Sequence, residues 1–269
     1  MIFIVKSCTA SLYAEPVSTS PRVDEVLHGM VVKAEDEQKD MVYIQTAYRY
    51  KGWINCKHLS KLPNWGEHFA PDGHVSQDKK AHYDIAYINA PAADVLAAPK
   101  VQAALIICLT LGCTVHIAEN HNESDGWTKI VLADNRIGYI RSAFLTSFPG
   151  KDVDGESFCE TAKLYLNTQY RWGGKTPLGI DCSGLCFMAY WLNGISIYRD
   201  SRIAEGFPIK EISPAKARKG DLLFFPGHVG MLIDKDNMIH SSVAGNGVRI
   251  EALTPEWRAR ITAAGSLLT

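Results

Sequence analysis

The stretch YRWGGKTPLGIDCSGLCFMAYWL, residues 170–192, carries the strongest structural signal in the chain. Its first half is rich in glycine and reads as a loop. From Cys182 to Asn193 the chain is mostly apolar and free of proline, and it closes on Gly194, a pattern that predicts a helix. Asp181 stands at the N-cap position, where a carboxylate accepts hydrogen bonds from the first turn. We therefore expect Cys182 at the start of a hydrophobic helix.

A thiol at this position has a chemical consequence. The unpaired N–H groups and the positive end of the helix dipole both favour thiolate over thiol, so we expect Cys182 to be reactive. The same N–H groups can donate to a developing oxyanion, which is the electrostatic stabilisation that acyl transfer needs. Cys182 is therefore the candidate nucleophile.

A nucleophilic thiol needs a proton acceptor, and two histidines downstream suit that task. His228 follows a loop glycine in FFPGHVGM and stands directly before a predicted strand. His240, in MIHSS, lies on the next predicted strand, and antiparallel pairing across a short turn would set it beside His228. We expect His228 to act as the base and His240 to orient it, the third role in a catalytic triad.

The region that carries these residues is predicted to be an α+β domain. A helical stripe of apolar residues runs from Ser157 to Asn167, and the helix that begins at Cys182 follows it. Strand-like runs then follow, which are DLLFF, HVGMLI, NMIHSS and GVRIEAL. Helices followed by such runs predict a packed antiparallel sheet, and we place this domain at residues 149–269.

The first 150 residues contain a weak internal repeat of short apolar runs separated by turn residues. The repeat is carried by two sets of positions that fall at matching offsets once three extra residues in one loop are allowed for, Leu12, Pro16, Gly29, Trp53 and Leu59 in the first, and Val95, Pro99, Gly112, Tyr139 and Leu145 in the second. Such runs predict two small all-β barrels, at residues 1–62 and 80–148. The polar, glycine- and proline-containing segment at 63–79 reads as a linker.

Two resemblances to known families rest on these motifs. The endings GWINCKHL and GYIRSAFL resemble the closing strand and helical turn of bacterial SH3-like domains. The runs DCSGL, GDLLFF..GHVGM and IHSS resemble the NlpC-type papain-like cysteine peptidases of the bacterial cell wall, in the order Cys, His, polar residue. The resemblance implies a papain-like domain that hydrolyses the amide between γ-D-glutamyl and a diamino acid in murein peptides.

The resemblance also implies roles for individual residues. Cys182, His228 and His240 would form the triad, and Tyr170 would line the oxyanion site. Two SH3-like units before such a domain resemble, more narrowly, the γ-D-glutamyl-L-diamino acid endopeptidases that act on peptides with a free amino-terminal L-alanine. In that subgroup the first SH3-like unit walls the cleft. The implied substrate-binding residues are Asp181, Ser183 and Ser201 in the last domain, and Tyr48, Tyr50 and Glu37 in the first.

Five alternatives stay open at the level of sequence. Cys182 and Cys186 lie four residues apart and, with His228 and His240, match the ligand types of a zinc site. His240 is also compatible with a plain structural histidine, and Tyr170 with a packing aromatic. An N-acetylmuramoyl-L-alanine amidase would use a similar Cys and GHV pattern, and a non-catalytic binder of cell-wall peptide would keep the same domains. We expect neither a metal nor a cofactor.

The composition limits the classes of molecule that we expect the protein to bind. The chain has 28 basic and 29 acidic residues and a formal net charge of -1, which gives no overall footprint for nucleic acid or an anionic membrane. It shows neither a signal-peptide core nor a run of about 20 apolar residues. Seven cysteines without disulfide-framework spacing fit a reducing compartment, so we expect a cytoplasmic monomer that binds murein peptide.

The remaining histidines fall in no recognisable motif, and we expect them at the surface. They are His28, His58, His68, His74, His82, His116 and His121.

Overall fold

The computed structural model describes residues 1–63, 85–118, 126–148 and 154–267. It divides the chain into two compact units, Met1–Phe148 and Pro149–Thr269. Apart from residue 63, the predicted linker at 63–79 lies outside the described residues. Within these described ranges no helix is long and apolar enough to cross a bilayer.

The first unit begins with a seven-stranded antiparallel sheet in the order β3-β2-β6-β5-β4-β1-β7. In β2 buried residues alternate with half-buried ones, and the sheet encloses a core that includes Ile4, Leu12 and Ile44, each fully buried. A short 3-10 turn, Cys56–His58, leads into the last strand. The strands are β1 Ile2–Val5, β2 Thr9–Tyr13, β3 Arg22–Leu27, β4 Val31–Gln38, β5 Met41–Thr46, β6 Lys51–Asn55 and β7 Leu59–Lys61.

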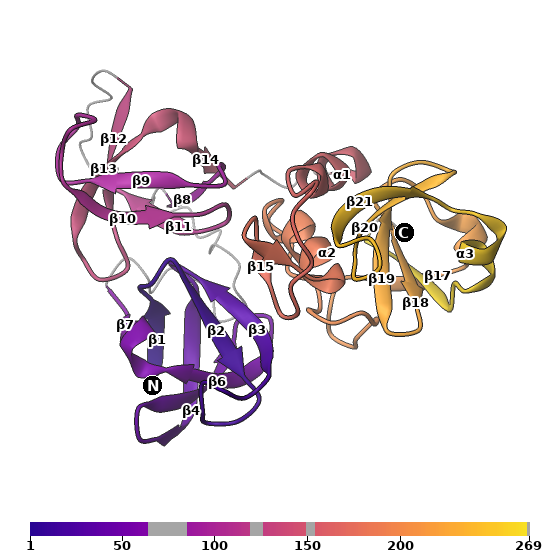
Figure 1. The fold of residues 1–269 in the computed structure, drawn as a ribbon, viewed down its shortest axis with the longest axis horizontal. Coiled ribbons are helices and arrows are strands. Elements are labelled where there is room, and N and C mark those ends of the chain that lie inside the picture. Colours follow the sequence, from indigo (N-terminus) through magenta and orange to yellow (C-terminus); the bar gives the residue numbers. More distant parts are fainter. Residues whose placement is uncertain (64–84, 119–125, 149–153, 268–269) are drawn as a thin grey trace. The chain divides into compact units, whose positions relative to one another are not determined.

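A second seven-stranded sheet follows in the same unit, in the order β10-β9-β13-β12-β11-β8-β14, with a 3-10 turn at Ser142–Phe144 before its last strand. Each strand occupies the place that its counterpart seven numbers earlier holds in the first sheet, so the two topologies are identical (Figure 1). The strands are β8 Ile85–Ile88, β9 Ala93–Leu96, β10 Leu105–Leu109, β11 Thr114–Ile117, β12 Trp127–Val131, β13 Ile137–Arg141 and β14 Leu145–Ser147.

The repeat seen in the sequence therefore has a structural basis. Leu12 and Val95 occupy equivalent strands and are both fully buried. Gly29 and Gly112 both adopt left-handed backbone conformations, with φ of 83° and 88°, in the turn that precedes the fourth strand of each sheet. Side chains other than glycine rarely adopt this conformation, so both turns require glycine.

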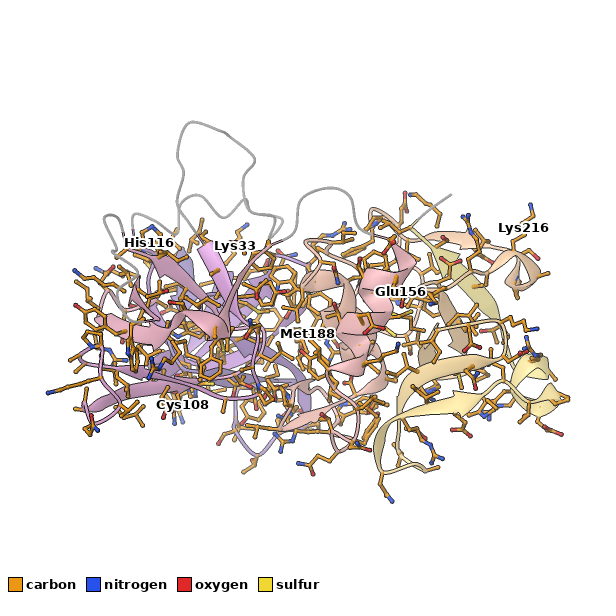
Figure 2. All side chains as sticks on the ribbon, turned by 90° about the horizontal axis from the view of Figure 1, so that it is seen from above. Lys33, Cys108, His116, Glu156, Met188 and Lys216 are labelled. Carbon is orange, nitrogen blue, oxygen red and sulfur yellow. The ribbon has the colours of Figure 1, made fainter. Side chains whose placement is uncertain are left out.

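The second unit packs two helices against a sheet. Helix α1, Gly155–Lys163, is capped by Asp154, whose side chain accepts from the N–H of Ser157. Helix α2, Cys182–Trp191, is buried along its whole length and contacts α1, β19 and β20 (Figure 1). Figure 2 shows Met188 on this buried helix and Glu156 on α1, where it is exposed. The full burial explains why the α2 sequence is apolar all round.

The sheet of this unit has six antiparallel strands in the order β17-β22-β18-β19-β20-β21. A separate two-stranded hairpin, β15 and β16, lies in the glycine-rich loop before α2. The strands are β15 Lys175–Thr176, β16 Gly179–Ile180, β17 Lys210–Ile212, β18 Leu222–Phe225, β19 His228–Leu232, β20 Asn237–Ser242, β21 Gly247–Ala252 and β22 Ala263–Ser266, and the 3-10 turn Pro214–Lys216 and helix α3, Pro255–Ala259, complete the unit.

The observed elements confirm the predicted fold class, an α+β papain-like domain preceded by all-β SH3-like sheets. The run of helices followed by antiparallel strands appears in the predicted order.

The expectation that the remaining histidines lie at the surface is wrong for two of them. His28 is fully buried and His116 is 7% exposed, because both side chains lie inside the first unit. His58 is half-buried. The other four, His68, His74, His82 and His121, lie outside the described residues.

Candidate active site

The start of α2 is held by a buried carboxylate. Asp181 is the N-cap, as predicted, and its Oδ1 accepts a 2.6 Å hydrogen bond from the N–H of Gly184. Its Oδ2 accepts a 2.7 Å hydrogen bond from the N–H of Gly173, in the glycine-rich loop. The carboxylate thus ties the loop before the nucleophile to the first turn of the helix.

Arg199 completes this anchor from the segment that follows α2. Its guanidinium donates to both oxygens of Asp181, at 2.9 and 3.0 Å, and to Oγ of Ser183 at 2.7 Å. Arg199 is 1% exposed, and a charge so deeply buried requires a paired and hydrogen-bonded partner. The bidentate pair supplies it and fixes Asp181 and Ser183 on either side of Cys182.

Close packing explains why the last residue of the DCSG run, Gly184, has no side chain. A Cβ atom at this position would lie 2.3 Å from the carbonyl oxygen of Gly174 and 2.9 Å from Oδ1 of Asp181. Both atoms belong to the anchor, so the helix start packs against the loop only because residue 184 has no side chain.

Cys182 occupies the first position of α2 and is 7% exposed. The backbone N–H groups of Val229 and Ser183 lie close enough to its sulfur to act on the pKa of the thiol, which they lower. Val229 directly follows His228 at the start of β19, so the sulfur lies against the strand that carries the candidate base. Cys182 is therefore a buried residue at the start of the helix, with a small part of its surface exposed.

The expected preference for the thiolate is wrong for the resting site. Burial, together with the negative charge of Asp181, raises the pKa of the Cys182 thiol. The backbone N–H groups and Arg199 act in the opposite direction but do not outweigh these two effects. The resting sulfur is therefore a neutral thiol that must pass its proton to a base when it attacks.

A tight hairpin positions His228. Strands β18 and β19 pair so that Phe225 lies opposite His228, which leaves only Pro226 and Gly227 in the loop. Gly227 has φ of 67°, and proline followed by a glycine with positive φ suits a two-residue turn of this kind. The histidine therefore projects from the first residue of a rigid strand rather than from a loop.

His240 lies beside it, as the predicted strand pairing required. Nε2 of His228 and Nδ1 of His240 are 2.8 Å apart, a hydrogen-bond distance. The ring of Trp257, on α3, has its centroid 6.1 Å from that of His228 and 5.5 Å from that of His240. With Nε2 engaged by His240, Nδ1 is the ring nitrogen of His228 that remains for proton exchange with a thiol.

The environment of His228 keeps it neutral. Burial lowers the pKa of this imidazole to about 4, and the neighbouring His240 and Arg260 contribute to the shift. Burial also lowers the pKa of His240, although Glu251 opposes this effect. Near neutral pH the site thus contains a neutral thiol and a neutral imidazole, which is the protonation state in which His228 can act as a base.

Tyr170 is brought close to the nucleophile by a parallel bridge between its backbone and Ile180. Burial and the nearby Cys182 and Asp181 raise the pKa of the phenol to about 12. The hydroxyl group therefore keeps its proton at neutral pH and can serve as a hydrogen-bond donor. Its role beside an oxyanion stays a prediction.

The predicted substrate-binding residues occupy different environments. Asp181 and Ser183 flank Cys182, and Ser201 is half-buried in the segment after Arg199. In the first unit Tyr48 is buried, with its hydroxyl group 2.6 Å from Oδ2 of Asp24. Tyr50 there is half-buried and Glu37 is exposed. Their binding roles remain predictions.

The zinc alternative finds little support in this geometry. His240 uses both ring nitrogens on protein partners, Nδ1 toward His228 and Nε2 toward Glu251, which leaves neither for a metal. Among the described residues no group of three or more histidine, cysteine, aspartate or glutamate side chains is arranged to hold an ion.

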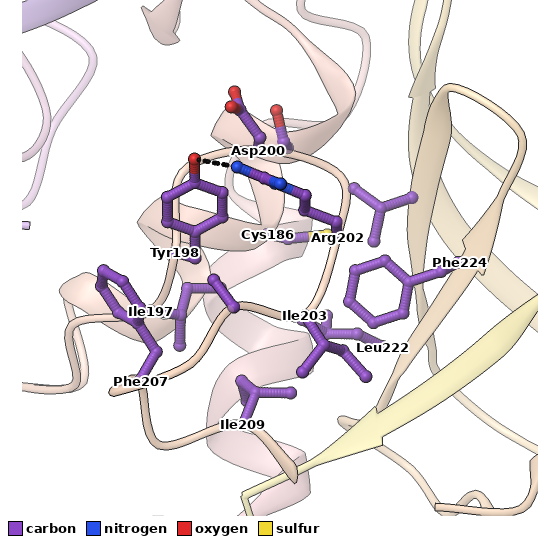
Figure 3. A pocket seen from close by; sticks show the side chains of 13 residues that line it. Cys186, Ile197, Tyr198, Asp200, Arg202, Ile203, Phe207, Ile209, Leu222 and Phe224 are labelled. Carbon is purple, nitrogen blue, oxygen red and sulfur yellow. Dashed lines mark hydrogen bonds between the residues drawn. The ribbon is translucent and has the colours of Figure 1, made fainter. Parts of the chain in front are cut away.

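A pocket lies between α2, the segment that follows it and strands β18 and β19 (Figure 3). Ser183 and Val229, the residues next to Cys182 and His228, form part of its lining. The segment that carries Ser201 forms another wall, where Figure 3 shows Arg202 donating a 2.9 Å hydrogen bond to the hydroxyl oxygen of Tyr198. The rest of the lining is largely apolar.

The sequence did not predict three residues of the site, which are Arg199, Glu251 and Trp257. An arginine directly after the residues ISIY was the available signal for Arg199, since a buried cation needs an acid. For Glu251 the signal was strand register. Arg249 pairs with His240, so Glu251, two residues further along, faces the same side of the sheet.

Comparison with known proteins agrees with this geometry. The model of the NlpC/P60 family matches residues 167–266. Dipeptidyl-peptidase 6 of Lysinibacillus sphaericus is 42% identical to this chain over 98% of both proteins. A gamma-D-glutamyl-L-lysine dipeptidyl-peptidase of Bacillus subtilis is 32% identical over 43% of this chain and 42% of its own length.

Structural comparison gives the same fold. The crystal structure of an NlpC/P60 family protein from Bacillus cereus superposes with a TM-score of 0.81, at 21% identity, and each chain is covered completely. Given this agreement and the full-length similarity in sequence, the chain belongs to the NlpC/P60 family and is a cysteine peptidase that hydrolyses cell-wall peptides.

Proposed function

We propose that this peptidase cleaves the amide between γ-D-glutamate and the diamino acid of murein peptides whose amino-terminal L-alanine is free. The observation that carries the proposal is the hydrogen-bonded pair of His228 and His240 beside the strand position that lies against the Cys182 sulfur, in a chain similar over nearly its whole length to a dipeptidyl-peptidase. The name of the Bacillus subtilis relative, a gamma-D-glutamyl-L-lysine dipeptidyl-peptidase, supports the same bond.

In the proposed reaction the Cys182 thiol transfers its proton to Nδ1 of His228 as the sulfur attacks the γ-carbonyl carbon. Because the resting thiol and imidazole are both neutral, charge separates only when the substrate carbonyl is in place. The oxyanion would then be stabilised by the N–H at the start of α2 and by the hydroxyl group of Tyr170.

Collapse of this intermediate breaks the amide. The protonated His228 gives its proton to the leaving amine of the diamino acid, and L-alanyl-γ-D-glutamate stays bound to sulfur as a thioester. Water, deprotonated by His228, then hydrolyses the thioester and restores the thiol. His240 holds the ring of His228 through both steps by the bond at Nε2.

The requirement for a free amino terminus would arise from an acidic group near the nucleophile. We assign the ammonium group of L-alanine to the predicted residue Asp181. Asp181 already accepts hydrogen bonds from Gly173, Gly184, Ser183 and Arg199. Because Arg199 also balances its charge, Asp181 would contribute to binding chiefly as one of several polar groups at this position.

The test uses two pairs of tripeptides, L-Ala-γ-D-Glu followed by diaminopimelate or lysine, each with a free or an acetylated amino terminus. Mass spectrometry of the products from the free peptides is expected to show the dipeptide L-Ala-γ-D-Glu and the free diamino acid. Acetylation is expected to reduce kcat/KM by at least about 100-fold, because an ammonium-binding site would lose its charge pair. Equal turnover of free and acetylated peptides would contradict the end specificity, and turnover by the Cys182→Ala variant would contradict the mechanism.

A further inference from the structure

The hydrogen-bonded chain of the site does not end at His240. Glu251, on β21, places Oε2 3.0 Å from Nε2 of His240. Its other oxygen, Oε1, accepts a 3.2 Å hydrogen bond from the indole N–H of Trp257, on α3. The ring of Trp257 also lies against both histidines. A carboxylate and an indole thus extend the site by two residues from two further elements.

The chemistry of these groups fixes where the protons lie. An ionised carboxylate only accepts, so His240 must carry its proton at Nε2, facing Glu251. Nδ1 of a neutral His240 is then a bare acceptor, and Nε2 of His228 must donate to it across 2.8 Å. In a neutral His228 this leaves Nδ1 without a proton. That is the one tautomer in which His228 can take the thiol proton.

The carboxylate is ionised where this argument needs it. Burial alone would raise the pKa of Glu251, but its hydrogen bonds with Trp257 and His240 and the charge of Arg249 bring it below its ordinary value. The indole contributes by occupying Oε1, which leaves Oε2 as the oxygen that faces His240.

We propose that Glu251, held by Trp257, is a positioning residue that sets the tautomers of both histidines and thereby prepares Nδ1 of His228 as the base. This inference rests on the proposed role of His228 in the reaction. It adds a fourth and a fifth residue to the Cys, His, His set that the sequence predicted.

The isosteric substitution Glu251→Gln tests it. The amide offers one acceptor and one donor in place of two acceptors. If its oxygen stays with the indole, its NH₂ group faces His240 and demands a bare Nε2. Both histidines then shift tautomer and the proton of His228 moves to Nδ1. We expect kcat to fall by about 100-fold, the size of effect that a general base supplies.

A second substitution should rescue the first. Trp257→Phe keeps an aromatic ring over the histidines but removes the indole donor. In Glu251→Gln/Trp257→Phe the amide oxygen is free to face His240, which restores the productive tautomer. We expect the double variant to be at least about five-fold more active than Glu251→Gln, a coupling between neighbours that additive effects cannot produce. Trp257→Phe alone should lose some activity, because Oε1 then lacks its donor.

The pH profile gives a second readout. His228 is faced by His240 on β20, by Glu251 on β21 and by Arg260 after α3, whereas His240 is faced by Glu251 and Arg249. Glu251 is the acidic group among them and raises the pKa of both imidazoles. Its neutralisation should therefore move the acid limb of kcat/KM to lower pH while the plateau falls. Glu211→Gln is the control, because Glu211 is exposed on β17 of the same sheet and touches neither ring in the described contacts.

The decisive measurement is nitrogen NMR of ¹⁵N-histidine-labelled wild type, Glu251→Gln and Glu211→Gln without substrate. We expect Nε2–H tautomers for both rings in the wild type and in Glu211→Gln, and Nδ1–H tautomers in Glu251→Gln. Unchanged tautomers and an unchanged pH profile in Glu251→Gln would overturn the inference. A wrong assignment of the substrate would instead show as missing turnover by the wild type with the tautomers as expected.

Discussion

His28 and His228 are both imidazoles whose pKa is lowered to about 4 by burial, yet they belong to different kinds of site. In the first unit, Nδ1 of His28 donates to the carbonyl oxygen of Lys6 at 2.9 Å, and Nε2 accepts from the N–H of Ala133 at 3.1 Å. Both ring nitrogens are committed to backbone partners. His228 commits only Nε2, to His240.

The difference shows what a perturbed pKa does and does not reveal. Burial is the largest cause of a shift in the same direction and to about the same pKa in a structural and in a catalytic histidine. The two histidines differ in whether a ring nitrogen remains available for proton transfer. His28 can neither take nor give a proton without losing a backbone hydrogen bond, whereas His228 keeps Nδ1 available next to the strand position that contacts the Cys182 sulfur.

The largest expected effect is the loss of the nucleophile itself. Cys182→Ala should reduce hydrolysis of a murein tripeptide by at least about 10⁴-fold, because no other group of the site can form the thioester. Product formation followed by liquid chromatography and mass spectrometry measures this. Cys56→Ala, at an exposed cysteine of the first unit, is the matched control and should keep wild-type turnover.

The comparison itself is tested by exchanging the two histidines for alanine. His228→Ala should lower kcat by about 10³-fold, as expected for a lost general base, and leave the first unit unchanged. His28→Ala should destabilise the first unit by about 2–4 kcal/mol, because it leaves a cavity and two unpaired backbone groups. Both variants are measured by kinetics and by local hydrogen exchange. His228→Ala should change mainly kcat, and His28→Ala mainly the protection of the first unit. A kinetic loss of similar size in both would break the distinction.

Low pH should reduce the stability of the first unit through protonation of His28. An imidazole whose pKa is lower when folded contributes stability that is present above its unfolded value and is lost as the pH falls. For His28 that window runs from 6.5 to about 4. A shift of this size corresponds to about 3 kcal/mol, since each pKa unit is about 1.4 kcal/mol.

Hydrogen exchange of peptides from β1 and β4 reports the stability of the first unit, because both strands belong to it. The wild type should lose protection between pH 6.5 and 4, and His28→Gln should lose less, so that the difference between the two narrows as the pH falls. A difference that stays constant across this range would show that the pKa of His28 is not lowered in the folded unit.

The smallest expected effect concerns the phenol near the nucleophile. Tyr170→Phe should lower kcat by about 10- to 100-fold with little change in KM, because its hydroxyl group is proposed to donate only to the oxyanion. The loss should be constant from pH 6 to 9, since the phenol has a pKa of about 12 and stays protonated throughout. An equal rise in KM would indicate a binding role instead.

Local patterns predicted most of the site. The N-cap at Asp181 and the helix that follows it depend on a few adjacent residues, and the proximity of His228 and His240 follows from a hairpin and the pairing of neighbouring strands. The duplicated barrel was visible because matching glycines and core positions recur.

Other features depended on contacts that a linear pattern does not contain. His28 is buried because Ala133, 105 residues away, covers its Nε2. The raised pKa of Cys182 comes from burial and from the charge of Asp181, and both depend on how the helix start packs. Arg199 pairs with Asp181 across 18 residues, and Trp257 reaches Glu251 from a short helix that the strand pattern did not predict.

The most direct test of the account is the alkylation rate of Cys182 by iodoacetamide in the wild type and in His228→Ala, measured by mass spectrometry of the labelled peptide. It asks, without any substrate, whether the imidazole accepts the proton of a thiol whose own pKa is raised. We predict that His228→Ala slows labelling of Cys182 by at least about ten-fold near neutral pH, while exposed Cys56 reacts equally in both proteins. Equal rates at Cys182 would contradict the thiol–imidazole pair on which the mechanism depends.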